Sequence, residues 1–319
     1  MTQAAAHSSA SSAADVIVVG AGPAGSSAAY HMATLGLDVI LLEKQELGRD
    51  KVCGDGLTPS AVRELVSMGV DTSGWQRNRG LRVIGGGHLL HFPWPEQASF
   101  PSYGMARPRA LLDRDLAEHA AAAGARLLTG VTVTAPVTSP TGRVTGVEAR
   151  PTNRVAYPGI EGPTTFTAPL VIDAGGVSAR LATAVGRTKN ERRPMGVAVR
   201  AYFRSPRAQD VWMESRLELW DGAPGKSDLL PGYGWIWSVG EGLVNVGLGS
   251  VSSRAQATAI DYRAVFNRWM DNVPASWGFT KENQVGGLVS AALPMAFNRK
   301  PHYADGLMLL GDAGGMVSP

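Results

Sequence analysis

Three glycines near the start of the chain have the spacing of a phosphate-binding turn. Gly20, Gly22 and Gly25 form the pattern GxGxxG. In such a turn the first glycine permits a tight bend, the second lets the backbone approach a pyrophosphate, and the third lets a helix pack closely on a strand. The first turn of the following helix adds free N–H groups and partial positive charge. We therefore predict a dinucleotide site here, and we include Pro23 and Ala24 in it.

The segments on either side of these glycines distinguish a nucleotide site from an ordinary turn. Residues 15–20 (DVIVVG) form an apolar run typical of a strand buried on both faces, and residues 23–35 form an alanine-rich helix. Residues 38–43 (DVILLE) are a second buried strand, which completes a right-handed βαβ crossover. Glu43 ends this strand where a carboxylate can accept hydrogen bonds from both ribose hydroxyls, and Lys44 follows it. Together these elements predict binding of an adenine dinucleotide.

The remainder of the chain mixes helix and sheet patterns. Residues 109–124 and 262–271 have helical patterns. Strand patterns occur at residues 81–92, 131–134, 170–173 and 306–310, and four alternating segments lie at 196–203, 215–220, 232–239 and 243–251. We predict an α/β fold in which an antiparallel-sheet substrate domain is inserted into a doubly wound nucleotide-binding domain. The nucleotide-binding domain is assigned to residues 15–62, 105–185 and 300–319, and the inserted domain to residues 63–104 and 186–299.

Composition excludes several classes of protein. The net charge is +3 and the arginines are scattered, so the chain lacks the basic runs that hold a nucleic-acid backbone. Cys53 is the only cysteine, so no intrachain disulfide can form and nothing suggests secretion. Residues 1–14 lack a basic start and a long apolar stretch, which predicts a disordered leader and not a signal peptide. No apolar run is long enough to span a membrane, so we expect a cytoplasmic protein, for which peripheral membrane attachment stays open.

Three further segments resemble motifs of the glutathione-reductase-like, hydroxylase-type flavoproteins. Gly311 and Asp312 follow a strand, as in the second flavin motif of that group, where the aspartate binds the ribitol chain. Residues 170–180 (LVIDAGGVSAR), with Asp173, are similar to the group's middle Asp-Gly motif, although its second glycine stands one residue late. Arg107 resembles the arginine before the third helix that contacts the cofactor. The resemblance implies that the dinucleotide is FAD and that the domain is an FAD-binding Rossmann domain.

Two loops carry a closer resemblance, to the geranylgeranyl reductase family. Residues 51–59 (KVCGDGLTP) resemble that family's KxCGxGLxP loop, and residues 231–237 (PGYGWIW) with 244–247 (VNVG) resemble its aromatic segment and the following strand. The likeness covers nearly the whole chain and is nearest to the actinobacterial menaquinone reductase branch. Ser238 is a departure, since a proline is usual there. The family continues beyond the second flavin motif, so we expect this chain to be a C-terminally truncated form.

The family resemblance implies reduction of isolated C=C bonds in a polyprenyl chain, either a menaquinone side chain or a geranylgeranyl lipid. Reduced flavin would deliver hydride from N5 to one alkene carbon while a proton reaches the other, so the protein must supply orientation, a dry tunnel and a proton path. The electron donor would be NAD(P)H, a reductase or a ferredoxin. The resemblance also places four residues of the loop at the cofactor: Cys53, Gly54, Asp55 and Gly56.

Cys53 and Asp55 are the candidate catalytic residues, and each has a structural alternative. Cys53 would deliver a proton or control access to the flavin; otherwise it is a small residue packed in a tight turn. Asp55 would relay a proton; otherwise it caps the helix that begins near Pro59.

An aromatic segment supplies the candidate substrate wall. Tyr233, Trp235 and Trp237 alternate, so a strand would present all three on one face. They would line an apolar slot for isoprene units; otherwise they are core between sheets. His88 and His91 lie three residues apart in a strand pattern, which puts them on opposite faces, so we expect no metal site there.

Two other functions stay open at this point. An FAD-dependent aromatic monooxygenase of the hydroxylase type shares the fold, and fold alone does not decide function. A truncated chain would alternatively act as a non-catalytic binder of a nucleotide or lipid.

Overall fold

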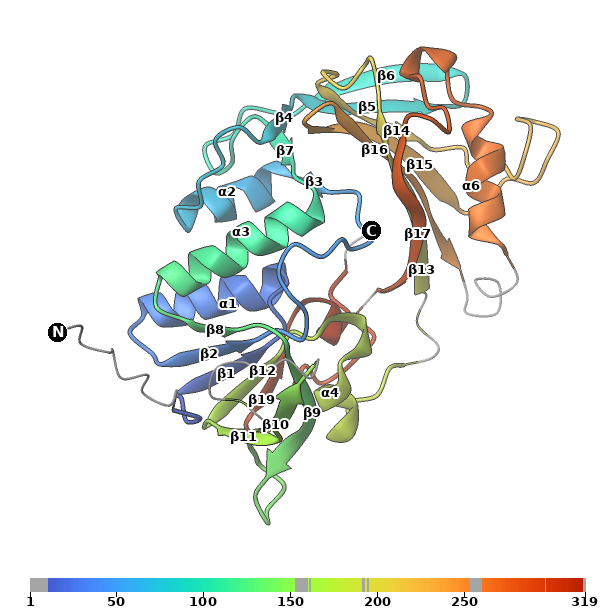
Figure 1. Ribbon diagram of the computed structural model, residues 1–319. Helices are drawn as coiled ribbons and strands as arrows, with labels where there is room; N and C mark the ends of the chain where they lie inside the picture. Colours follow the sequence, from blue (N-terminus) through green and yellow to red (C-terminus); the bar gives the residue numbers. More distant parts are fainter. Residues whose placement is uncertain are drawn as a thin grey trace. The chain divides into compact units, whose positions relative to one another are not determined.

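The computed structural model describes residues 11–152, 160, 162–190, 193, 195–252, 260–295 and 297–317 (Figure 1). The chain divides into two compact units. Unit 1 comprises Met1–Arg49, Asp113–Lys189 and Phe297–Met316, and unit 2 comprises Asp50–Leu112, Asn190–Ala296 and Val317–Pro319. Each unit is therefore assembled from segments that lie far apart in the sequence.

Unit 1 is built on a six-stranded sheet with the strand order β18-β19-β12-β1-β2-β8. Its strands are β1 (Val16–Val19), β2 (Val39–Leu42), β8 (Arg126–Leu128), β12 (Leu170–Asp173), β18 (Tyr303–Ala304) and β19 (Leu307–Leu309). All neighbouring pairs are parallel except β18 with β19. Helix α1 (Pro23–Thr34) joins β1 to β2, which is the crossover that the sequence predicts.

Two layers cover the six-stranded sheet. The elements of these layers are α1, α3 (Arg109–Ala122), α4 (Arg180–Ala184), β9 (Val131–Thr138), β10 (Val144–Pro151) and β11 (Thr164–Thr167), with the short turn η1 (Gly176–Ser178) before α4. Val16 and Val18 of β1 pack with Ala29 of α1 and Ala117 of α3. Ile17 packs on the other side, with residues of the small sheet β9–β11 and of α4. Alternate residues of β1 thus face opposite layers, and the predicted α/β fold is confirmed.

Unit 2 contains a seven-stranded sheet with the strand order β17-β13-β16-β15-β14-β5-β6. Its strands are β5 (Gly80–Gly85), β6 (His88–Pro93), β13 (Met195–Arg204), β14 (Trp212–Arg216), β15 (Gly232–Gly240), β16 (Leu243–Ser252) and β17 (Gln284–Pro294). The unit also holds β3 (Gly56–Leu57), β4 (Gln76–Asn78), β7 (Gly104–Ala106), α2 (Pro59–Ser67), α6 (Tyr262–Met270) and η2 (Ala275–Trp277). The sheet is antiparallel, as predicted, except that β14 pairs in parallel with β5.

The two faces of this sheet have different partners. On one face Ile236 and Val246 pack with Phe266 and Trp269 of α6 in an apolar core. The Trp269 ring lies against Gly234, where a Cβ atom would stand 2.1 Å from it, so only glycine fits there. The opposite face carries the odd-numbered residues of β15 and therefore the aromatic segment that the sequence analysis singled out.

One expectation about this sheet is wrong, and one of its strands was not predicted. The alternating segment 215–220 does not form the predicted strand, because β14 ends at Arg216 and beyond it Trp220 makes only an isolated bridge with Leu229. Leu217 is exposed and Leu219 is buried, so two leucines that a strand would place on one face differ in burial. The sequence analysis also missed β17, whose glycines, alanines and serine obscure the alternation of its larger side chains.

The division into units differs from the predicted domain boundaries. Residues 50–62 and 105–112, which the sequence analysis assigned to the nucleotide-binding domain, belong to unit 2. The reason is local hydrogen bonding: Trp237 Nε1 donates to the Gly54 carbonyl, and Asn245 Nδ2 donates to the Cys53 carbonyl. The loop before α2 is therefore fastened to the large sheet.

Candidate active site

The glycine turn after β1 has the close packing that the sequence predicts. Gly20 has a φ of +100°, and a Cβ atom there would lie 2.5 Å from the Ala174 carbonyl oxygen. A Cβ atom on Gly25 would lie 1.9 Å from the Gly20 carbonyl oxygen. Both positions therefore require glycine, the first for its backbone conformation and the second for the approach of α1 to the strand.

The N-terminus of α1 is open toward a ligand. Gly22 is the N-cap residue in an extended conformation, Pro23 follows at the first helical position, and no side chain of the described residues caps the helix. The N–H groups of the first turn have no partner within the helix and carry partial positive charge. This geometry fits a pyrophosphate, so the residues present fit the ADP half of a dinucleotide.

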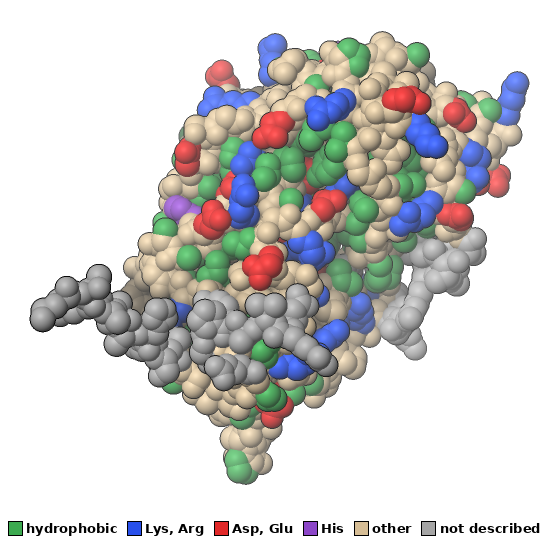
Figure 2. All heavy atoms as spheres, in the orientation of Figure 1, with side chains coloured by type: hydrophobic (Ala, Val, Ile, Leu, Met, Phe, Trp, Pro, Cys, Tyr) green, Lys and Arg blue, Asp and Glu red, His purple; other side chains and the backbone are tan. Residues whose placement is uncertain are grey.

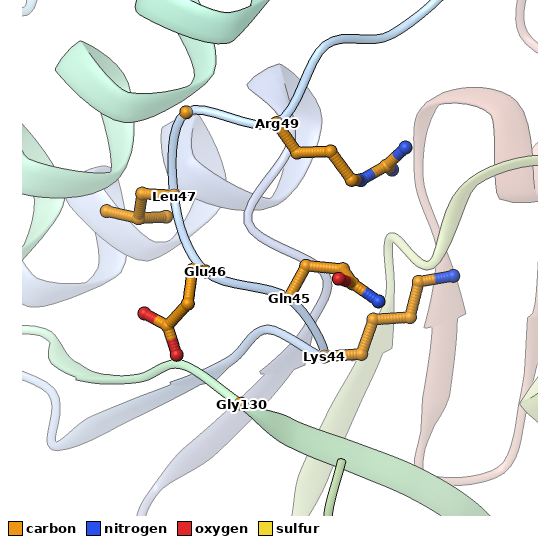
Figure 3. Close-up of a pocket in the computed structure, with 7 residues that line it drawn as sticks. Lys44, Gln45, Glu46, Leu47, Arg49 and Gly130 are labelled. Carbon is orange, nitrogen blue, oxygen red and sulfur yellow. The ribbon is translucent and has the colours of Figure 1, made fainter. Parts of the chain in front are cut away.

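Glu43 lies beside this turn at the end of β2. Its Oε2 accepts the Ala21 N–H at 2.9 Å, and its Oε1 accepts the Gln45 N–H at 3.0 Å. Each carboxylate oxygen has a further lone pair, which ribose hydroxyls can use. A pocket of about 250 Å³ lies at the loop that follows β2, and the side chains that line it come from this loop (Figure 3). Its lining residues are Lys44, Gln45, Glu46, Leu47, Gly48, Arg49 and Gly130.

The second flavin motif reaches the first one within unit 1. Gly311 begins the short helical turn η3 (Gly311–Gly314) directly after β19, with a φ of +59°. A Cβ atom on Gly311 would lie 2.9 Å from the Cβ atom of Ala24, in the first turn of α1. The fold thus places Gly311 against the first turn of α1, and the contact of the next residue, Asp312, with a cofactor stays a prediction.

Asp173 has a clear structural role. Its Oδ1 accepts the Gly175 N–H at 2.9 Å, and its Oδ2 accepts the Ala182 N–H at 3.0 Å. Burial raises the pKa of this carboxyl group, and the two N–H groups oppose that rise. Asp173 therefore fixes the turn that leads into α4, and its contact with a cofactor stays a prediction.

In unit 2, Asp55 is the centre of a buried hydrogen-bond cluster. Its Oδ2 accepts the Tyr202 hydroxyl at 2.5 Å and the Asn245 amide at 2.8 Å, while Oδ1 accepts the Arg109 N–H at 3.1 Å. Asp55 is 1% exposed and has a φ of +63°. Burial raises the pKa of Asp55 to about 6, against the lowering effect of the hydrogen bonds from Tyr202 and Asn245.

The alternative that Asp55 caps the helix beginning near Pro59 is wrong. Thr58 is the N-cap residue of α2, and its side chain accepts the Ala61 N–H. Asp55 instead receives the first N–H of α3, from Arg109. The carboxylate therefore links the loop, the start of α3 and the large sheet.

Tyr202, Asn245 and Arg200 belong to this cluster, and the sequence analysis missed them. Tyr202 and Asn245 stand opposite each other on β13 and β16, in the same row as Trp237 of β15. The Arg200 guanidinium is buried, lies 4.1 Å from the centroid of the Tyr202 ring and donates to the Lys51 carbonyl. Burial, followed by the adjacent Asp55 carboxylate, raises the pKa of Tyr202. The sequence signal that could have revealed this cluster is a polar residue within an otherwise apolar strand pattern, as with Arg200 in β13 and Asn245 in β16.

Trp237 fastens the loop to the sheet, and Trp235 holds the Asn245 side chain that also binds the loop. Trp235 and Trp237 are 5% and 8% exposed, and their rings are 6.0 Å apart. Trp235 Nε1 donates to Asn245 Oδ1, and a Cβ atom on Gly247 would lie 2.2 Å from the Trp235 ring. The Trp237 ring lies close to Gly54 in the same way, since a Cβ atom on Gly54 would be 2.8 Å from that ring. Both glycines are therefore required by these rings.

Cys53 and Arg107 lie on either side of Asp55 in the unit 2 cluster. Burial, the largest effect, raises the pKa of the Cys53 thiol, whose sulfur accepts the Asp55 N–H at 3.3 Å. The side chain therefore stays a thiol at neutral pH and is not an activated nucleophile. The Arg107 N–H donates to the Asp55 carbonyl, and its guanidinium lies 5.2 Å from the centroid of the Trp75 ring.

The open glycine turn, the acid at the end of β2 and the approach of Gly311 to α1 define an α/β protein of the dinucleotide-binding class. The sequence matches the FAD binding domain family over residues 13–274. It is 37% identical over 310 residues to a menaquinone reductase of Mycolicibacterium smegmatis, which covers 96% of this chain and 71% of that protein. It is 30% identical over 311 residues to digeranylgeranylglycerophospholipid reductase 2 of Methanopyrus kandleri, again covering 96% and 71%.

A solved structure agrees with these sequence comparisons. A geranylgeranyl bacteriochlorophyll reductase-like protein of Thermoplasma acidophilum matches with a TM-score of 0.76 and 24% identity, over 95% of this chain and 72% of that chain. This likeness shows a common fold. The chain belongs to the geranylgeranyl reductase family of FAD-dependent oxidoreductases, and the predicted family and cofactor are confirmed.

Proposed function

We propose that this protein reduces C=C bonds of a polyprenyl chain, with a menaquinone side chain as the first candidate and a geranylgeranyl lipid as the second. Its sequence identity with a menaquinone reductase over nearly the whole chain supports this substrate class. The structural observation that carries the proposal is the buried carboxyl group of Asp55, which three donors hold in the loop before α2. Reduction of an alkene needs one hydride and one proton, and Asp55 supplies a place for the proton.

FAD, when bound in its reduced form, supplies the hydride for one alkene carbon. Gly20, Gly22 and Gly25 would hold the pyrophosphate, and Glu43 the ribose. The other contacts with the cofactor belong to the proposal as well. They are assigned to Pro23, Ala24, Lys44, Cys53, Gly54, Asp55, Gly56, Arg107, Asp173, Gly311 and Asp312.

Asp55 holds the proton for the second alkene carbon. Its pKa of about 6 lets the carboxyl group exchange a proton near neutral pH, which suits a general acid. After the transfer, the Tyr202 hydroxyl, the Asn245 amide and the Arg109 N–H stabilise the carboxylate that remains. Tyr202 and Asn245 are therefore positioning residues, and the Cys53 thiol is a second, weaker source of a proton.

The aromatic face of β15 would provide the wall for the isoprene units. Tyr233 is 38% exposed, whereas Trp235 and Trp237 are almost fully buried and hydrogen-bonded through their indole N–H groups. Tyr233 is therefore the member of the three that is accessible to a lipid chain. The tryptophans would shape the wall and keep the loop with Asp55 in place.

The remaining parts of the proposal concern location and partners. Among the described residues, no helix has the length and apolar character needed to cross a bilayer. Figure 2 shows Lys and Arg side chains interspersed with Asp and Glu on the face that it presents, which is unlike a nucleic-acid surface. We assign a cytoplasmic location with peripheral contact to the inner face of the membrane, and NAD(P)H, a reductase or a ferredoxin as electron donor.

Product analysis tests the proposal. The FAD-loaded chain, reduced with dithionite, is incubated with a polyprenyl menaquinone or with a geranylgeranyl lipid. We expect a product whose side chain has gained two hydrogens, so that its mass stays two units above that of the substrate after any hydroquinone has been reoxidised to the quinone. Unchanged masses for both lipids would reject the proposal, and phenol-stimulated oxygen consumption with NAD(P)H would assign the protein to the aromatic monooxygenases. A chain that retains no FAD would instead fit a non-catalytic binder.

A further inference from the structure

The hairpin of β5 and β6 presents large apolar side chains to solvent. All six residues of β6 are exposed, and β6 is the edge strand of the large sheet in the part of the chain that the structure describes. Leu89, Leu90 and Phe92 are 54%, 51% and 50% exposed. Leu217 is 54% exposed and lies against Gly85, the last residue of β5 before the turn of the hairpin. Exposed apolar groups this close together mark an interaction surface.

The sequence around this hairpin has a one-sided charge. Residues 72–95 contain three arginines and two histidines, and they contain no Asp or Glu. Arg77 and Arg79 are exposed, and their guanidinium groups lie 4.4 Å and 5.7 Å from the ring centroids of Tyr103 and Trp212. The hairpin therefore combines apolar side chains with positive charge, which fits an anionic partner.

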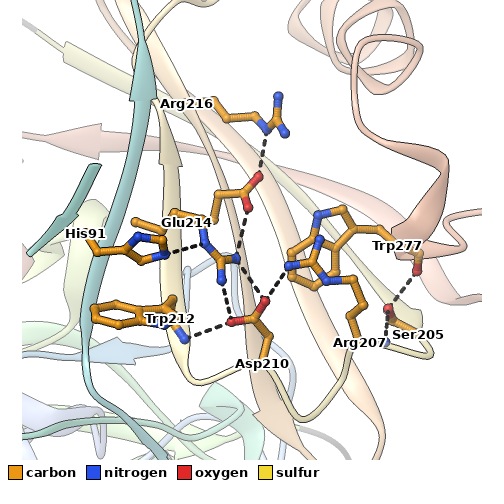
Figure 4. Close-up of polar contacts among 9 residues, drawn as sticks. His91, Ser205, Arg207, Asp210, Trp212, Glu214, Arg216 and Trp277 are labelled. Carbon is orange, nitrogen blue, oxygen red and sulfur yellow. Dashed lines mark hydrogen bonds and ion pairs between the residues drawn. The ribbon is translucent and has the colours of Figure 1, made fainter. Parts of the chain in front are cut away.

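The two carboxylates that pair with the hairpin are themselves buried. Asp210 and Glu214 are 8% and 3% exposed, and both pair with Arg82 of β5. Arg207 also pairs with Asp210, and Arg216 also pairs with Glu214 (Figure 4). This network also fastens β5 to β14, so the hairpin is held rigidly in the position where its apolar side chains are exposed.

A second contact fixes the orientation of the edge strand. The Arg82 Nε–H donates to His91 Nε2 at 3.2 Å, and the His91 ring lies 4.5 Å from the Trp212 ring, centroid to centroid (Figure 4). His91 therefore points into the network. Phe92 and Leu90, one residue to either side of it, point from the opposite face of the strand.

We propose that the β5–β6 hairpin docks this protein on an anionic lipid surface. Leu90 and Phe92, on one face of β6, enter the boundary between headgroups and acyl chains, and Arg77 and Arg79 bind lipid phosphates. The inference rests on the proposed function in one respect, since a polyprenyl substrate resides in lipid. A second copy of this chain, pairing through the β6 edge, is the other occupant that the test distinguishes.

Vesicle co-sedimentation of the FAD-loaded chain tests this surface. The probes are vesicles of phosphatidylcholine alone and of phosphatidylcholine with phosphatidylglycerol. We expect stronger binding to the anionic vesicles, a loss of about tenfold in L90S/F92S, and a loss of about fivefold per arginine in R77Q and R79Q that is confined to the anionic vesicles. The matched control is L35S, because Leu35 is 79% exposed on α1 of unit 1, and this variant should bind like the unmodified chain.

The outcomes separate the docking surface from the proposed reaction. Equal vesicle binding by L90S/F92S and the unmodified chain, or failure of the unmodified chain to bind, would overturn the inference. A dimer in sedimentation velocity without lipid that L90S/F92S abolishes would assign the edge to a second copy. Reduction of detergent-dispersed menaquinone by the unmodified chain is measured separately from vesicle binding. If the unmodified chain does not reduce it while vesicle binding differs between the variants as expected, the proposed function fails and the docking surface stands.

Discussion

The Tyr202 hydroxyl donates to Asp55 Oδ2 across 2.5 Å, and so joins a strand of the large sheet to the loop before α2. The bond has two consequences. It stabilises the ionised form of Asp55, which opposes the effect of burial on its pKa. It also fixes one carboxylate oxygen, because Asn245 binds the same Oδ2 atom and leaves Oδ1 to the Arg109 N–H. The position and the proton affinity of Asp55 therefore depend on the same contacts.

The pH dependence of turnover should report on this bond. If protonated Asp55 supplies the proton, the rate falls as the pH rises through about 6. Tyr202→Phe removes a donor that favours the carboxylate, so the falling limb should move up by about one pH unit. The rate of product formation is measured between pH 5 and 9 for both proteins. A limb at the same pH in the variant would contradict the assignment, and Tyr262→Phe, altered at another buried hydroxyl, is the control.

The free energy of unfolding should depend on pH because of the same Asp55 carboxyl group. The pKa of Asp55 is raised from 3.8 to about 6, so the folded state holds a proton that the unfolded state has already released. Asp55 therefore lowers the free energy of unfolding progressively between about pH 4 and 6, by about 3 kcal/mol in total. In Asp55→Asn this component is absent. Urea denaturation at several pH values should give curves of unfolding free energy that diverge between the two proteins, and parallel curves would reject a raised pKa.

Asn245 should control the mobility of the loop before α2. Asn245→Ala removes the donor to Asp55 and to the Cys53 carbonyl, and it leaves the Trp235 indole N–H without its acceptor. We expect a loss of about 2–3 kcal/mol in stability and faster hydrogen exchange at residues 53–57. The control is Asn272→Ala, which removes a hydrogen bond to the Gly222 carbonyl elsewhere in unit 2. Equal exchange of the loop in both variants would show that Asn245 does not hold it.

The glycine turn should be the part of the chain that retains FAD. Gly25→Ala puts a Cβ atom 1.9 Å from the Gly20 carbonyl oxygen, so α1 must move away from β1 and its first turn loses the phosphate. We expect a purified variant without flavin colour and at least a hundredfold weaker binding of added FAD. Gly287→Ala is the matched control, because no atom lies within 4 Å of a Cβ atom there. Full flavin content in the Gly25 variant would contradict the proposed cofactor site.

Local pattern was sufficient for the nucleotide-binding elements. β1, α1 and β2 lie where the apolar run, the glycines and the second run predict them, because a buried parallel strand needs a continuous apolar sequence. The tight turn at Gly20 and Gly25 and the place of Glu43 beside it also follow from local sequence, and their contact with a cofactor stays a prediction. The approach of Gly311 to Ala24 followed only from the resemblance, since no local pattern joins the two ends of the chain.

The cluster around Asp55 depends on strand register, which local pattern does not provide. Tyr202 and Asn245 meet Asp55 because β13, β16 and β15 pair in one particular alignment. Asp55 and the alternation of Trp235 and Trp237 could be recognised in the sequence. That the Trp237 indole N–H and the Asn245 amide hold the loop could not, because this requires knowing which loop lies over which face. Buried polar residues within apolar strands are the feature to look for in such cases.

Anaerobic single turnover tests the central claim most directly. The FAD-loaded chain is reduced, freed of excess reductant and mixed with a polyprenyl menaquinone in the absence of oxygen, while flavin absorbance and lipid mass are followed together. The account predicts that flavin is reoxidised with one dihydro lipid formed per flavin, counted after correction for any hydroquinone. Flavin that stays reduced, or that is reoxidised with all of its electrons recovered in the quinone ring and no saturated side chain, would contradict it.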